Sequence, residues 1–84
     1  DAAEQKNLAR LSTLLEQMPP EKAAEIIQQM ADGGKMDSAV KILAGMKERN
    51  AANVLARLPD PSLAPQLIEK MRLLKRPLVA SADK

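Results

Sequence analysis

One spacing of apolar residues recurs four times along this chain and limits what the chain can fold into. In each copy, an alanine is followed by aliphatic residues or methionine three, four and seven positions later, which places all four side chains on one face of an α-helix. The copies are Ala23, Ile26, Ile27 and Met30; Ala39, Ile42, Leu43 and Met46; Ala51, Val54, Leu55 and Leu58; and Ala64, Leu67, Ile68 and Met71. This internal repeat predicts an array of short helices, each of which buries its apolar face against its neighbours.

Prolines and glycines divide the chain into five expected helices. Proline disfavours a helical residue before it but is tolerated in a first helical turn, and glycine suits the residue that follows a helix. We expect helices at residues 3–18, 20–30, 36–45, 48–58 and 63–75, with Asn50 as an alternative start and cap for the fourth. Ser62 is expected to cap the fifth. We interpret Asp32-Gly33-Gly34 as a turn between helices rather than a phosphate or calcium loop, because no strand precedes it and Gly34 stands where calcium needs an oxygen ligand.

The length of 84 residues is enough for one small domain. We predict an all-α fold of five short helices stacked as a right-handed superhelical repeat domain, since each helix is too short to be stable alone. We expect residues 1–18 to form an N-terminal amphipathic helix, residues 19–76 to form the repeat domain and residues 77–84 to form a frayed tail.

The expected first helix does not follow the repeat. Its apolar residues Leu8, Leu11, Leu15 and Met18 are spaced by three, four and three positions, and Leu14 widens the stripe. This spacing is found in helices that face a core and also in the seam of a coiled coil. We favour the core-facing helix, with the end of a longer coiled coil as the alternative. The predicted partner-binding residues are Leu8, Leu11 and Leu15, and a homodimer through this helix stays open.

The residue types present exclude most enzyme chemistry. The chain contains no His, Cys, Phe, Tyr or Trp, so the commonest general bases and nucleophiles, and all thiolate chemistry, are missing. Glu21 and Glu25 lie one helical turn apart, and each has a lysine nearby. We interpret both as surface charges on an amphipathic helix. We predict no catalytic residue, no cofactor and no metal site.

The charge balance also argues against a nucleic-acid partner. The net charge of +2 is too small to indicate a polyanionic ligand. Cations gather near the end of the fifth expected helix, where they suit the helix dipole, but no aromatic side chain is present to stack on bases. These cations are Lys70, Arg72, Lys75 and Arg76. No apolar run approaches the roughly 20 residues that span a bilayer, so contact with a membrane is expected only through segments outside this chain.

Two stretches of the chain carry a resemblance to a known family. Residues 18–30, MPPEKAAEIIQQM, and residues 46–61, MKERNAANVLARLPDP, resemble the MgtE intracellular N-domain superfamily, and the likeness extends over residues 8–71. The resemblance implies a right-handed superhelix of short helices. It is closest to the flagellar, MotE-like branch, because a helix leads directly into the first repeat and the chain is less acidic than the magnesium-channel branch.

The resemblance implies a non-catalytic scaffold or chaperone-like domain of a bacterial, flagellar MotE-like protein. Its partner would be another protein, such as a component of the flagellar motor. The alternative is the cytosolic, Mg²⁺-sensing regulatory N-domain of an MgtE-type magnesium channel. Proteins of both branches are associated with membranes. The domain would lie either in the periplasm or on the cytoplasmic side of the membrane, and the sequence does not decide between these two compartments.

Overall fold

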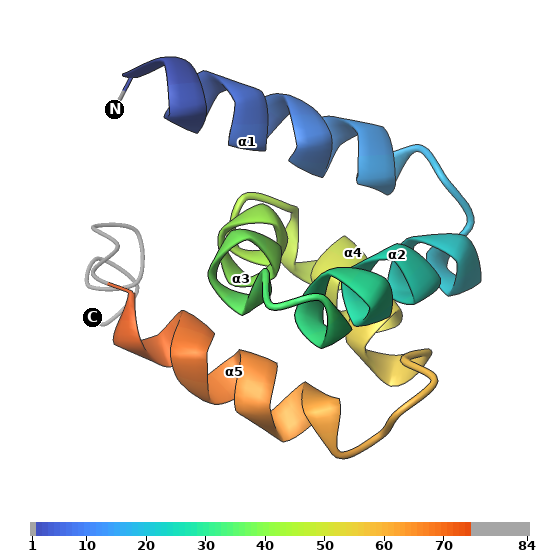
Figure 1. Cartoon of the computed structure of the whole chain (residues 1–84). Helices are drawn as coiled ribbons and strands as arrows, with labels where there is room; N and C mark the ends of the chain where they lie inside the picture. The colour runs from blue at the N-terminus through green and yellow to red at the C-terminus, as the bar shows by residue number, and fades with distance from the viewer. Residues whose placement is uncertain (1, 75–84) are drawn as a thin grey trace, which may run out of the picture.

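The computed structural model describes residues 2–74, which form five α-helices (Figure 1). The helices are α1 (Ala2–Glu16), α2 (Pro20–Asp32), α3 (Met36–Ala44), α4 (Glu48–Ala56) and α5 (Leu63–Leu73). The predicted all-α class is confirmed, with the predicted number of helices in the part of the chain that is described. The expected last residues of the fifth helix and the expected tail at residues 77–84 lie outside the described residues.

Helix α3 lies in the centre of the molecule. It packs against α1, α2 and α5, while α2 packs against α1, α3 and α4. Figure 1 shows α1 and α5 on opposite sides of α3. Contacts therefore join helices that are neighbours in the chain and helices that are two apart, namely α1 with α3, α2 with α4 and α3 with α5. The right-handed superhelical arrangement stays a prediction.

The repeated stripe supplies most of the core. Its buried members are Ala23, Ile27, Ala39, Ile42, Leu43, Met46, Ala51, Val54, Leu58 and Leu67. Its half-buried members, which pack against that core, are Ile26, Met30, Leu55, Ala64 and Met71. The prediction is wrong for Ile68, which is 52% exposed. The buried side chains of α5 are those of Leu63 and Leu67, which lie one turn apart on the face toward the core. Because Ile68 follows Leu67 directly, its side chain points about 100° away from that face, toward solvent.

Local chain chemistry explains the turn between α2 and α3. Gly34 adopts a positive φ of 83°, a conformation that glycine reaches without steric cost. The Lys35 N–H donates to the Met30 carbonyl over 2.8 Å, and the Gly34 N–H donates to the Ala31 carbonyl over 3.2 Å. This pair of bonds is the Schellman motif, which satisfies the last carbonyls of a helix. The predicted turn at Asp32-Gly33-Gly34 is confirmed.

Two predicted caps are wrong. Ser62 precedes α5 but makes no side-chain capping bond, because its backbone is already helical at φ −73° and ψ −13°. Its N–H and its hydroxyl both donate to the Asp60 carboxylate, over 3.0 Å and 2.7 Å, which closes a tight turn before α5. The predicted start of α4 at Glu48 is confirmed, and Asn50, the alternative start and cap, lies inside the helix. The first helix ends at Glu16, two residues before its predicted end at Met18, and α4 ends at Ala56, two residues before Leu58.

Candidate interaction surfaces

A buried serine fixes α1 against α3. Ser12 is only 2% exposed, and its Oγ lies 2.7 Å from the Ile42 carbonyl oxygen and 3.1 Å from that of Leu8. Gly45 directly follows α3, and a Cβ atom there would lie 2.7 Å from the Ser12 Oγ. The two helices approach this closely because residue 45 has no side chain. Ser12 cannot be recognised from the sequence as a contact residue, since a lone polar residue beside an apolar stripe carries no signal of its partner.

A second polar contact joins the end of α1 to the start of α4. The Glu16 Oε2 accepts hydrogen bonds from the Lys47 N–H, over 2.6 Å, and from the Asn50 side-chain amide, over 3.0 Å. Lys47 is the residue before α4, so the carboxylate supplies the cap that no residue of α4 supplies, at the positive end of the helix dipole. The hydrogen bonds from Asn50 and then Lys47 hold the pKa of Glu16 below its ordinary value of 4.5.

The structure separates the three predicted partner-binding residues. Leu15 is 6% exposed and belongs to the core, and Leu8 is half-buried against that core. Leu11 is 40% exposed. The inward face of α1 is therefore Leu8, Ser12 and Leu15, and these predicted residues do not share one free surface. Leu15 is not available to a partner while α1 stays docked.

The solvent side of α1 carries a different set of residues, which we name the outer patch. It consists of Lys6, Asn7, Arg10, Leu11 and Leu14, all of them exposed. Leu14 is 55% exposed and lies one turn from both Leu11 and Arg10. Arg10 in turn lies one turn from Lys6. The outer patch therefore presents two leucines beside two cations.

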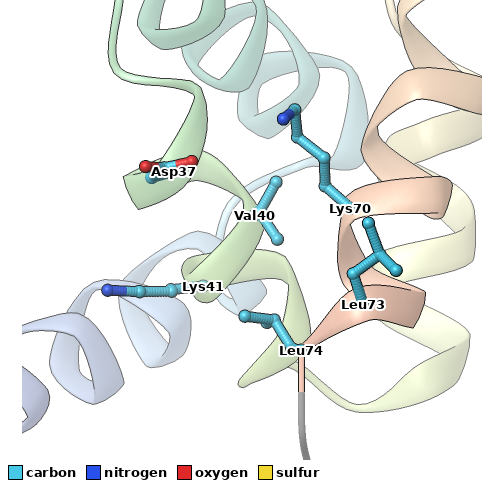
Figure 2. Close-up of a pocket in the computed structure, with 6 residues that line it drawn as sticks. All are labelled: Asp37, Val40, Lys41, Lys70, Leu73 and Leu74. Atoms are coloured by element: carbon cyan, nitrogen blue, oxygen red, sulfur yellow. The ribbon is translucent and has the colours of Figure 1, made fainter.

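A shallow groove between α3 and α5 is the second candidate surface (Figure 2). Its volume is about 290 Å³, and its lining residues are Asp37, Val40, Lys41, Lys70, Leu73 and Leu74. In Figure 2, Val40 lies between the two helices, and Lys41 extends away from α5. Leu73 is 60% exposed. The groove has an apolar floor, but it carries charges of both signs and so does not select a partner by charge.

Other predicted features can be placed within residues 2–74. Arg72 forms an ion pair with Glu69 on the same face of α5, and Glu21 and Glu25 are exposed on α2. Within this part of the chain, no three His, Cys, Asp or Glu side chains are grouped so that they could hold a metal ion. None of the described helices combines the length and the apolar character needed to cross a bilayer.

Comparisons of the chain with models of protein families, with curated proteins and with solved structures find no match.

Proposed function

We propose that this chain is a non-catalytic interaction domain that binds a protein partner through the outer patch of α1. The observation that carries this proposal is the exposure of Leu11 and Leu14, at 40% and 55%. Both lie on a helix whose other face is already docked on α3 through Ser12 and Leu15. The domain does not need the two leucines for its own core, and a partner that covered them would remove apolar surface from water.

The place of α1 in the molecule supports this role. It lies at the edge of the fold, opposite α5 across α3 (Figure 1). Its connections to the rest of the chain include the buried Ser12 bond and the Glu16 cap on α4. A helix that is docked through such contacts presents its outer side chains in a defined geometry, which lowers the entropic cost of binding.

The biological setting that we propose is the flagellar, MotE-like one, with a component of the motor as the partner. The support for it is the resemblance at residues 18–30 and 46–61. The test is a swimming assay in the bacterium that encodes this protein. The chromosomal copy of the gene carries both Leu11→Gln and Leu14→Gln. We expect the swimming zone in soft agar to shrink strongly while the level of the protein stays unchanged.

Ile68→Gln is the matched control, because Ile68 is 52% exposed and belongs to α5, which lies on the opposite side of α3 from α1 (Figure 1). It should leave swimming unchanged. Normal swimming of the double leucine variant would contradict the proposal.

The alternative is the Mg²⁺-sensing N-domain of a magnesium channel, and a different measurement separates it. Thermal melts followed by circular dichroism with and without millimolar Mg²⁺ report any binding of the ion to the folded chain. A rise of several degrees in Tm, absent with the same concentration of Na⁺, would favour the channel. An unchanged Tm is expected for the interaction domain.

A further inference from the structure

We propose that the segment that binds the outer patch is an acidic amphipathic helix: an apolar stripe of leucine type flanked by Asp or Glu. This inference rests on the proposed function and names the chemistry of its partner. The charges and the spacing of the outer patch together fit fewer partners than the two exposed leucines would alone.

The two charges of the outer patch, those of Lys6 and Arg10, are both positive. Arg10 lies one helical turn from Leu14, and Lys6 lies one turn from Arg10. Among the α1 side chains that the structure describes, the single carboxylate is that of Glu16, and it is hydrogen-bonded to the start of α4. Carboxylates on a partner would therefore meet the two cations Lys6 and Arg10 here, which provides electrostatic complementarity.

The apolar spacing fits a helix as the partner. Asn7, Leu11 and Leu14 follow one another by four and then three residues, which is the spacing of a coiled-coil seam. Leu8 and Leu15 cannot serve such a seam, since they face the core. An asparagine within a seam favours one register of pairing over others. The outer patch is thus a short second seam on the side of α1 that faces solvent.

Other occupants fit these observations less well. A second copy of this chain paired in parallel would bring its own Lys6 and Arg10 against the same two cations, and like charges at an interface are unfavourable. In an antiparallel pairing, the cations would find no carboxylate of the outer patch to meet. An anionic membrane surface would match the cations, but two leucines bury little area compared with the whole apolar face of a helix that lies on a membrane. The groove between α3 and α5 is a less suitable site for an acidic helix than the outer patch, because it carries charges of both signs.

The experiment uses the 84-residue chain and two synthetic, fluorescently labelled heptad peptides as probes. Both peptides contain about four heptads with leucine at the seam positions a and d. One peptide has glutamate at the flanking positions e and g, and the other has lysine there. Fluorescence anisotropy at low and at high salt gives the Kd for each peptide.

We expect the glutamate peptide to bind about tenfold more tightly than the lysine peptide at low salt. The ratio should fall at high salt, because exposed charges are screened. Lys6→Glu with Arg10→Glu should reverse the preference. Leu11→Gln with Leu14→Gln should weaken binding of the glutamate peptide by about tenfold. Ile68→Gln should leave both affinities unchanged. Because all the substituted residues are exposed, circular dichroism should show the same helix content in every variant.

Several outcomes would overturn the inference. They are equal affinity for the two peptides, no binding of the glutamate peptide, and binding that does not change in the double leucine variant. Sedimentation velocity that shows a dimer of the wild-type chain, lost in the double leucine variant, would instead assign the outer patch to a second copy. Tighter binding to vesicles of phosphatidylserine and phosphatidylcholine than to the glutamate peptide would assign it to a membrane.

The inference and the proposed function fail in different ways. If the peptide preference holds but the double leucine variant swims normally, the acidic-helix site stands and the flagellar function fails. If swimming depends on Leu11 and Leu14 but the two peptides bind equally well, the interaction domain stands and the acidic chemistry of its partner is wrong.

Discussion

Helices α1 and α3 use their apolar side chains in opposite ways. Helix α3 has nine residues, and its buried side chains, Ala39, Val40, Ile42 and Leu43, account for most of its apolar positions. Helix α1 has 15 residues, yet the buried side chains described for it are those of Ser12 and Leu15. Helix α3 is surrounded by α1, α2 and α5, whereas α1 packs on one side only. The central helix therefore contributes most of its apolar side chains to the core, and the peripheral helix leaves one face exposed to solvent.

The two helices also differ in what holds them. The contacts of α3 with its neighbours are mainly apolar, and they are spread over many atoms. Helix α1 depends in addition on two polar contacts, those of Ser12 with Ile42 and of Glu16 with Lys47. Each polar contact depends on a few atoms in one geometry. We therefore expect α3 to be sensitive to lost volume and α1 to be sensitive to changes at single atoms.

Truncation in α3 should have the largest effect. Leu43 is 0% exposed, and Leu43→Ala should lower the free energy of unfolding by about 2–5 kcal/mol, through lost burial and the cavity left behind. Urea denaturation followed by circular dichroism measures the loss. Leu14→Ala on α1 is the matched control, because the same atoms are removed from a side chain that is 55% exposed. Similar losses for both variants would contradict the contrast between the helices.

Adding a methyl group between α1 and α3 should have the next largest effect on stability. The Cβ of Gly45→Ala would lie 2.7 Å from the Ser12 Oγ, so α1 must shift, and we expect a loss of about 1–3 kcal/mol in the free energy of unfolding. Ser12→Ala alone should cost about 1 kcal/mol for the lost hydrogen bond.

The double variant Gly45→Ala with Ser12→Ala tests the cause of that loss. With the hydroxyl removed, the new Cβ would lie 3.4 Å from the Cβ of residue 12, and the backbone of residue 45 is already helical at φ −85° and ψ −5°. The double variant should therefore be more stable than the sum of the single losses implies. Additive losses in urea melts would show that the contact with Ser12 is not what limits residue 45.

Loss of the contact between Glu16 and α4 should lower the stability of the fold by a smaller amount, which depends on pH. Its hydrogen bonds from Asn50 and Lys47 lower the pKa of Glu16 below 4.5, so the unfolded chain takes up the proton at a higher pH than the folded chain. The stabilisation is complete above the unfolded value and is lost as pH falls through the folded pKa. Glu16→Gln should lower Tm at pH 7, and its difference from the wild type should narrow below pH 4.5.

Thermal melts over a range of pH measure this difference. The control is Glu25→Gln, which changes an exposed carboxylate on α2 and should leave Tm at pH 7 nearly unchanged. A difference between Glu16→Gln and the wild type that widens in acid would contradict the role of the carboxylate as a cap for α4.

Substitution in the outer patch should have the smallest effect on stability. Leu11→Gln and Leu14→Gln change side chains that are 40% and 55% exposed, so each should alter the free energy of unfolding by less than about 0.5 kcal/mol. Urea denaturation measures the change. A loss of more than about 1 kcal/mol would show that this face of α1 supports the fold and would remove the contrast with α3.

Much of the fold followed from short-range patterns. The repeated stripe identified most of the core, and Pro19-Pro20 and Asp32-Gly33-Gly34 marked the ends of the early helices within about two residues. The candidate site was predicted less well. The sequence placed it on the first helix, but it grouped Leu11 with Leu8 and Leu15, which the structure assigns to the inward face. Ile68 was wrongly assigned to the core in the same way. The spacing of apolar residues defines a stripe along a helix, but it does not show how much of that stripe a neighbouring helix covers.

The sequence by itself determined the helices, their ends to within about two residues and most of the apolar face of each repeat, because these depend on residues within one or two turns of each other. The tertiary structure decided which leucines of α1 stay free. That choice depends on how α1 is rotated against α3, with Leu8, Ser12 and Leu15 turned inward. In this rotation the Ser12 hydroxyl meets a carbonyl 30 residues away, beside a glycine that leaves room for it. It also decided that Glu16 is a cap for α4 rather than a free charge, since a helix accepts a cap from any segment that reaches its N-terminus.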